Sequence, residues 1–236
     1  MEKQTGKKMN IKHLLFDLDN TLYPSTAAID QGITRRMIGF VADFLGLDFQ
    51  QATERRIQRL PFFGTTLEWL KTEHGLTDIA AYFDAVHPPE EIEELNLDPN
   101  LRPFLQSLDL PMTILTNAPL CHAQRVLEFL NIADLFTSIH DIESNGFKGK
   151  PYPEAYHKAL ASSGFSISQT IFFDDHKKYT DGYQALGGQA VLVQHPSEAN
   201  RPHPLDSHSA PDVLPQLVIP SVYQIPQVLE QLAAQS

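Results

Sequence analysis

Two aspartates follow directly after an apolar run near the start of the chain. In "HLLFDLDNTLYP", residues 13–24, Asp17 and Asp19 stand one residue apart behind a segment typical of a buried strand. Two carboxylates in that position repel each other, and both lose hydration. The pair therefore implies a chemical function that requires it.

Polar side chains also follow two other apolar runs. "MTILTN" ends in Thr116 and Asn117, and "TIFFDD" ends in Asp174 and Asp175. In an open parallel sheet, ligands bind beyond the carboxyl ends of the strands, so we expect these side chains to meet in one crevice. Four carboxylates there would require a cation, and hard oxygen ligands that leave room for water suit Mg²⁺.

A glycine-rich turn, "GFKGKPYPEAY", lies between these two runs and carries Lys148 and Lys150. A lysine here would add positive charge for an anion bound beside the metal. Taken singly, each feature has an ordinary explanation, since Asp commonly forms turns or caps helices and surface lysines are solvated. An Asp pair after each of two strands, with Thr-Asn after a third, is much harder to explain by turn chemistry.

The elements that must position these residues alternate between strand and helix after Pro99. Short apolar runs without polar interruption predict strands in a parallel sheet that is covered by helices on both faces. The expected strands are 11–16, 112–117, 136–141, 170–175 and 189–193, and the expected helices are 100–108, 120–132, 153–164, 177–187 and 223–235. We predict an α/β fold with a Rossmann-like core.

The segment between the first strand and Pro99 has helical periodicity only. Its expected helices cover about 26–46, 50–60, 65–74 and 78–86. We interpret residues 1–23 and 99–236 as the core domain and residues 24–98 as a helical cap inserted after the first strand. Residues 195–222, rich in Pro, His and Ser, are interpreted as a long loop.

Composition limits the function classes. The 236 residues are 42% hydrophobic and carry a formal net charge of −11, which argues against nucleic-acid polymers and anionic membranes as partners. A small phosphorylated metabolite remains compatible with a locally positive pocket. A single cysteine, Cys121, fits a reducing compartment, and the absence of an apolar segment of signal-peptide or membrane-spanning length predicts a cytoplasmic protein.

Four segments in this order resemble the motifs of the haloacid dehalogenase-like (HAD) hydrolases. They are "DLDNT" at 17–21, "TN" at 116–117, "KP" at 150–151 and "FFDD" at 172–175, and the resemblance spans almost the whole chain. Within that superfamily, "FDLDNTLYP", "TNA" and "FFDD" are most similar to the pyrimidine 5′-nucleotidase group.

The resemblance implies a role for each motif. Asp17 would be the nucleophile that forms an aspartyl-phosphate, and Asp19 would protonate the leaving alcohol and then deprotonate water. Thr116, Asn117 and Lys150 would hold the phosphoryl oxygens. The Mg²⁺ ligands would be Asp17, the Asp19 carbonyl, Asp175 and, directly or through water, Asp174. Lys150 is preferred to Lys148 because it directly precedes the proline.

One position departs from the family pattern. The family usually carries Asp or Asn four residues after the metal-binding Asp, where this chain has Tyr179, and Asp181 lies nearby but out of register. The outer shell of the metal site is therefore expected to differ.

The sequence thus predicts a Mg²⁺-dependent phosphomonoesterase, with a nucleoside 5′-monophosphate as the favoured substrate. Alternatives are a phosphatase of a small sugar or organic-acid phosphate such as phosphoglycolate, a non-catalytic phosphate-binding regulator, and a receiver-type domain phosphorylated on Asp17. Three weaker features remain. Tyr23 is expected either to contact substrate at the cap hinge or to be buried, and Trp69 is expected in the core of the cap. The histidines of the Pro-rich loop are a weak candidate metal site, because their spacing matches no compact ligand set: His195, His203 and His208.

Overall fold

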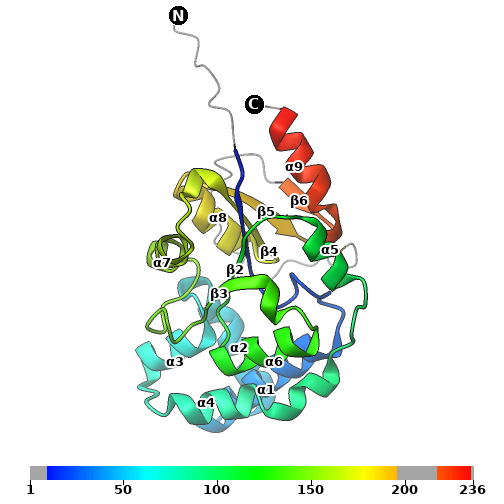
Figure 1. The fold of residues 1–236 in the computed structure, drawn as a ribbon. Helices are drawn as coiled ribbons and strands as arrows, with labels where there is room; N and C mark the ends of the chain where they lie inside the picture. Colours follow the sequence, from blue (N-terminus) through cyan, green and yellow to red (C-terminus); the bar gives the residue numbers. More distant parts are fainter. Residues whose placement is uncertain (1–9, 196–216, 235–236) are drawn as a thin grey trace, which may run out of the picture.

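The computed structural model describes residues 10–195 and 217–234, and its centre is a six-stranded sheet (Figure 1). All strand pairs are parallel, in the order β3-β2-β1-β4-β5-β6. The strands are β1 His13–Phe16, β2 Met112–Leu115, β3 Phe136–His140, β4 Thr170–Asp174, β5 Gln189–Val193 and β6 Leu217–Ile219. The predicted α/β class and parallel sheet are confirmed.

The expectation of a continuous loop over 195–222 is wrong at its end. Residues 217–219 form β6, which pairs with β5 at the sheet edge. A three-residue strand is too short to produce a periodic signal, and its parallel pairing with β5 is a long-range contact that local sequence does not reveal. The rest of that predicted loop, residues 196–216, lies outside the described residues.

Alternate side chains of β1 enter two apolar layers, as the strand pleat requires. Leu14 and Phe16 belong to one buried cluster, and Leu15 belongs to another on the opposite face. The first cluster is covered by α5 Leu101–Ser107, α6 Leu120–Phe129 and α9 Ile225–Ala234, and the second by α7 Pro153–Ser163 and α8 Lys177–Ala185. Short 3₁₀ turns accompany them at η3 Ala133–Leu135, η4 Ile167–Gln169 and η7 Val222–Gln224.

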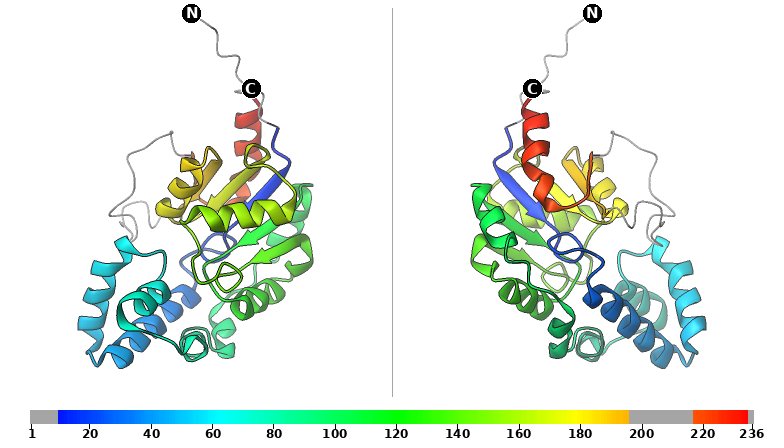
Figure 2. Two further views of the ribbon diagram at one scale, coloured as in Figure 1. Left: turned by 90° about the vertical axis from the view of Figure 1, so that its left-hand side faces the viewer. Right: turned by 90° about the vertical axis from the view of Figure 1, so that its right-hand side faces the viewer.

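Between β1 and α5 the chain forms helices, which pack beside the core (Figure 2). These are α1 Ala28–Leu45, α2 Phe49–Arg59, η1 Leu60–Phe62, α3 Thr66–His74, α4 Ile79–Val86 and η2 Pro89–Glu94. The helices of this segment share an apolar cluster that includes the fully buried Trp69 and Val41 of α1. Trp69 is therefore cap core, as expected, and α1 directs much of its apolar face into the cap.

Local signals explain where the cap helices begin and end. Asp48 accepts a hydrogen bond from the Gln51 backbone N–H, and the Gln51 side chain accepts one from the Asp48 N–H, which together form a capping box at the start of α2. Helix α1 ends at Gly46, whose φ of 65° is left-handed. These signals fix where α1 ends and where α2 begins.

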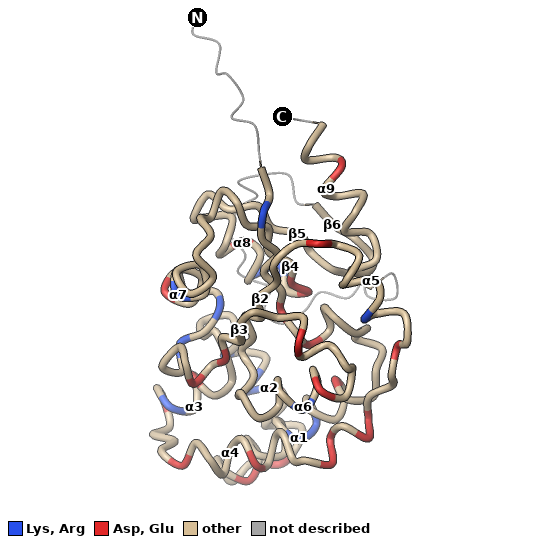
Figure 3. Tube along the Cα trace, in the orientation of Figure 1, with Lys and Arg blue, Asp and Glu red and all other residues tan. Residues whose placement is uncertain are grey.

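Acidic and basic residues are interspersed over the described core and cap rather than gathered into a basic stripe (Figure 3). This distribution agrees with the acidic composition. Within residues 10–195 and 217–234, no helix is long and apolar enough to cross a membrane.

Candidate active site

Three neighbouring strands deliver the first set of polar residues. β1 lies between β2 and β4, so the segments that follow these strands emerge side by side. The Asp17 N–H donates to the Phe173 carbonyl at 2.9 Å, and the Thr116 N–H donates to the His140 carbonyl at 2.9 Å, which continues the sheet pairing into the motifs. Asp17, Thr116 and Asp174 thus lie together at the carboxyl ends of the strands.

Lys150 joins two of these strands. Its Nζ lies 2.7 Å from Asp17 Oδ1 and 2.6 Å from Asp174 Oδ2, and the residue is only 1% exposed. Burial lowers the pKa of Lys150, but the two carboxylates outweigh burial and raise it above its ordinary value. Burial raises the pKa of Asp17 to about 8, against the opposing effect of Lys150. The site thus contains an ammonium held between two carboxylates.

The Asn117 side chain positions the loop that carries this lysine. Its Oδ1 accepts from the Lys150 N–H at 2.8 Å, and its Nδ2 donates to the Lys150 carbonyl at 2.9 Å. A Cβ added at Gly149 would lie 1.9 Å from Asn117 Oδ1, so glycine is required there for the close approach. Both polar atoms of the Asn117 side chain are therefore engaged by the Lys150 backbone. The Asn117 backbone N–H is the better candidate for the expected contact with a phosphoryl oxygen. The Thr116 hydroxyl accepts from the Ala118 N–H at 3.0 Å and keeps its own proton for donation.

Asp17, Asp174 and Asp175 form a carboxylate cluster whose ligand atoms all lie within 4.8 Å of one another. Burial and the charges of Asp174 and Asp17 raise the pKa of Asp175 well above its ordinary value. When ionised, these carboxylates carry three negative charges, and Lys150 supplies one positive charge. The remaining two negative charges and the all-oxygen donor set fit a divalent hard cation such as Mg²⁺.

Tyr179, the residue at the unusual position, lies beside the lysine rather than in the carboxylate cluster. The Lys150 Nζ is 5.1 Å from the centroid of its ring, and its hydroxyl donates to the Gly64 carbonyl of the cap at 2.9 Å. Asp181 is bound to Lys177, with both oxygens 2.8 Å from Nζ, and does not belong to the carboxylate cluster. Tyr179 thus links the core to the cap.

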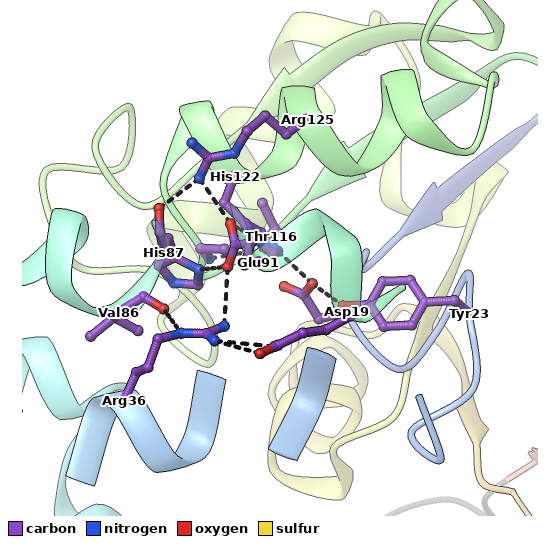
Figure 4. A network of polar contacts seen from close by, with 11 residues as sticks. Asp19, Tyr23, Arg36, Val86, His87, Glu91, Thr116, His122 and Arg125 are labelled. Carbon is purple, nitrogen blue, oxygen red and sulfur yellow. Dashed lines mark hydrogen bonds and ion pairs between the residues drawn. The ribbon is translucent and has the colours of Figure 1, made fainter. Parts of the chain in front are cut away.

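Asp19 is held by two donors at the same oxygen (Figure 4). Its Oδ1 accepts from the Tyr23 hydroxyl at 2.5 Å and lies 2.7 Å from His122 Nε2. Burial acts to raise the pKa of Asp19, but His122 and Tyr23 outweigh it and hold that pKa below its ordinary value. Tyr23 was expected near the hinge, whereas His122 was not predicted. No local signal in the sequence marks His122 of α6 as a contact of Asp19, which lies 103 residues away.

The site opens into a cavity of about 410 Å³ between core and cap. Asp17, Asp19 and Lys150 lie on its core side, and Arg56 of α2 lies on its cap side. Arg56 is half-buried, and its Nε donates to the Thr66 hydroxyl at 2.9 Å. This residue was also missed from sequence, because a lone Arg in an amphipathic helix gives no sign that it faces a cavity. The cap wall is otherwise mixed: apolar and aromatic side chains line it together with polar ones, namely Ile33, Met37, Leu67, Tyr82, Phe83, Asp30, Thr34, Thr65, Thr66 and His87.

Lys148 and Cys121 are not among the residues that line this cavity. Lys148 is exposed, with its Nζ 5.3 Å from the Tyr152 ring centroid, and Cys121 is exposed on α6. His195 ends the first described range, whereas His203 and His208 lie outside the described residues. The preference for Lys150 over Lys148 agrees with this placement.

Comparison with known proteins assigns the family. The family model for haloacid dehalogenase-like hydrolases matches residues 11–178, which include all four motifs. The chain belongs to this family. Its core follows the same fold as a HAD phosphatase from Thermococcus onnurineus, with a TM-score of 0.62 at 17% identity and coverage of 93% of this chain and 98% of that one.

Two curated relatives match much of the sequence. A phosphoglycolate phosphatase of Yersinia pseudotuberculosis is 26% identical over 90% of this chain and 95% of its own length. Phosphate metabolism protein 8 of Saccharomyces cerevisiae is 27% identical over 77% of this chain, and the match spans 61% of that longer protein. The chain is therefore a haloacid dehalogenase-like hydrolase, and its reaction and substrate are separate questions.

Proposed function

We propose that the protein is a phosphomonoesterase that works through an aspartyl-phosphate on Asp17, and that it prefers a nucleoside 5′-monophosphate. The observation that carries the proposal is the Asp17–Lys150–Asp174 arrangement at the base of a cavity that Asp19 also lines. Lys150 occupies Asp17 Oδ1, so Oδ2 is the oxygen that attacks phosphorus. Nucleophilic attack there splits one difficult hydrolysis into two easier steps.

The first step forms the Asp17–phosphorus bond and breaks the ester bond to the leaving alcohol. Asp19 donates a proton to the departing oxygen as that bond breaks. In the second step Asp19 takes a proton from water, which attacks phosphorus and releases inorganic phosphate and the Asp17 carboxylate. A bound phosphoryl group places negative charge beside Asp19 and raises its affinity for the proton that the first step needs.

Lys150, the Thr116 hydroxyl and the Asn117 backbone N–H are the groups we assign to the phosphoryl oxygens. Charge gathers on these oxygens during transfer, and donors that are already in place stabilise it without reorganisation. The Asn117 side chain contributes indirectly, since its two bonds to the Lys150 backbone fix the base of the lysine.

The carboxylate cluster supports Mg²⁺ as the cofactor. Asp17, Asp175 and the Asp19 carbonyl would hold the ion, with Asp174 less available because its Oδ2 binds Lys150 and its Oδ1 accepts from the His176 N–H at 2.8 Å. When bound, Mg²⁺ neutralises negative charge on the transferring phosphoryl group. Tyr179 takes the place of an outer carboxylate, and we expect this to alter metal affinity only moderately.

The cavity between core and cap supports a nucleotide as the substrate. A cavity of about 410 Å³ lies in the usual size range for small-molecule sites. Tyr82 and Phe83 offer aromatic surface for a base, and the Arg56 guanidinium can donate to its carbonyl oxygens. Phosphoglycolate is the second candidate, supported by the name of the Yersinia relative, with Arg56 then binding the glycolate carboxylate.

Hydrolysis by wild-type protein and by Asp17→Asn tests the proposal. We expect Mg²⁺-dependent release of phosphate by the wild type and a loss of several orders of magnitude in the variant, with thermal unfolding retained as one cooperative transition. Retention of a tenth of the wild-type rate by Asp17→Asn would refute the nucleophile. A substrate panel of UMP, CMP, AMP, phosphoglycolate and hexose phosphates tests preference, and a higher kcat/KM for a non-nucleotide would overturn the nucleotide proposal alone.

A further inference from the structure

A buried carboxylate outside the proposed reaction forms the centre of a second charged cluster. Glu91 of η2 is only 1% exposed, and it is contacted from both the cap and the core (Figure 4). Its Oε1 lies 2.7 Å from His122 Nδ1 and 2.8 Å from Arg125 Nη2, and its Oε2 lies 3.1 Å from His87 Nδ1. Buried carboxylates are costly unless paired in this way, so the cluster is expected to hold something in place.

His122 connects this cluster to the proposed acid. Its side chain is fully buried on α6, and both ring nitrogens are engaged, Nδ1 with Glu91 and Nε2 with Asp19 Oδ1 at 2.7 Å. The ring is therefore fixed at both ends, and a rotation of its plane would break one bond or the other.

The bonds at Asp19 select one of its oxygens. Tyr23 and His122 both bind Oδ1, at 2.5 and 2.7 Å. Two donors at one oxygen define the carboxyl plane, and Oδ2 is left for the cavity that Asp19 lines. A group that transfers a proton needs this kind of fixed approach, because rate falls steeply when reacting atoms are misplaced.

We propose that His122, anchored by Glu91, is a positioning residue that turns Asp19 so that Oδ2 faces the oxygen of the leaving group. This inference rests on the proposed phosphatase reaction and deepens it. His122 acts through Asp19 and touches no reacting atom. Glu91 acts one step further back, by fixing the direction of the His122 ring.

Elements of both the cap and the core contact the Glu91 cluster. Arg36 of α1 lies 3.7 Å from Glu91 and binds Glu94 at 3.0 Å, and its Nε donates to the Val86 carbonyl at 2.9 Å. Arg125 of α6 donates to the His87 carbonyl at 2.7 Å as well as to Glu91. The orientation of Asp19 therefore depends on contacts from both sides of the cleft.

A metal ion is the competing explanation, since His87, Glu91 and His122 offer ligand atoms within 4.8 Å of one another. The surrounding charges argue against it. Guanidinium groups of Arg36 and Arg125 lie against the same carboxylate and would repel a cation, and His122 has both nitrogens engaged. The contacts of both Glu91 oxygens and both His122 ring nitrogens are thus accounted for without a metal ion.

The test compares two leaving groups in the variants His122→Ala and Glu91→Gln. UMP releases an alkoxide that needs a proton, whereas p-nitrophenyl phosphate releases a stable phenolate that does not. We expect His122→Ala to lower kcat/KM for UMP by about 100-fold, the lower range for loss of general acid catalysis, and that for p-nitrophenyl phosphate by less than about 5-fold. Glu91→Gln should give a smaller loss with the same selectivity.

The matched control is His157→Ala, which changes an exposed histidine of α7 and should leave both substrates unaffected. A merely structural role of His122 predicts equal losses for the two substrates, and that result would overturn the proposal. If His122→Ala fails to fold, His122→Gln, which retains an amide donor, and Glu91→Gln decide the question by the same ratio. If alkyl phosphates such as UMP are not hydrolysed by the wild type at all, the proposed function fails instead. Stoichiometric Zn²⁺ in purified wild type, lost in Glu91→Gln, would support the metal explanation and refute ours.

Discussion

Replacing Lys150 by Met should both stop turnover and destabilise the fold. The ammonium is 1% exposed and lies 2.7 and 2.6 Å from two carboxylates. Met retains much of the side-chain volume, so the loss is mainly electrostatic. Removing one partner of a buried ion pair typically costs about 3–5 kcal/mol, because an uncompensated charge stays behind. We expect a loss of that size in Mg²⁺-free protein at neutral pH.

The assay is urea denaturation of the wild type, Lys150→Met, Asp174→Asn and the double variant, with and without Mg²⁺. The double variant should lose at least about 1 kcal/mol less than the sum of the single losses, since residues in one ion network couple by about 0.5–3 kcal/mol. Mg²⁺ should stabilise Lys150→Met more than the wild type, because the ammonium no longer repels the cation.

The control for the Lys150 experiment is Lys148→Met. Lys148 is exposed, and its ammonium lies over the Tyr152 ring, so its replacement should cost less than about 1 kcal/mol. A loss below about 1 kcal/mol in Lys150→Met, or strict additivity in the double variant, would refute the reasoning. Weaker stabilisation of Lys150→Met by Mg²⁺ would contradict the shared-carboxylate arrangement.

Three further predictions concern the metal, the substrate and pH. Asp175→Asn should raise the Mg²⁺ concentration needed for half-maximal activity by at least about 10-fold, whereas Asp181→Asn, which loses only its bonds to Lys177, should leave it nearly unchanged; comparable effects would move the metal site. Arg56→Met should raise KM for UMP with little change in kcat for p-nitrophenyl phosphate, and an unchanged KM would remove Arg56 from the substrate site. Burial lowers the pKa of His13 from 6.5 to about 4, so the unfolded chain takes up the proton first and stability should fall by up to about 3 kcal/mol between those pH values. Urea denaturation at neutral pH and near pH 4 measures this loss of unfolding free energy. The loss should be smaller in His13→Gln by the share that His13 contributes, and an unchanged pH dependence would contradict the prediction.

The sheet and the polar residues at the carboxyl ends of its strands could be predicted, because the sequence patterns that indicate them are local. Each of the strands β1, β2 and β4 is a short apolar run, and each is followed at once by the residues it delivers. Because parallel strands have their carboxyl ends on the same side of the sheet, these residues could be placed together without knowing any side-chain contact. The helical periodicity of the cap was equally local, and the helices formed within two residues of the expected bounds in α2, α3 and α4.

The parts that were missed depend on contacts between distant segments. Glu91 and His122 are 31 residues apart, and His122 and Asp19 are 103 apart. Nothing in the surrounding sequence distinguishes His122 from another buried helix residue. The role of the Asn117 side chain also depended on folding, since only the turn at Gly149 brings the Lys150 backbone to it.

The most direct test of the account is chemical detection of phosphate on Asp17. In Asp19→Asn, p-nitrophenyl phosphate should still phosphorylate the enzyme, because its leaving group needs no acid, while hydrolysis slows without a base. Borohydride reduces an aspartyl-phosphate to homoserine, which peptide mass spectrometry locates. We predict a burst of p-nitrophenol and homoserine at position 17 only when substrate is present. A burst without homoserine at that position, or with homoserine at another aspartate, would contradict the account.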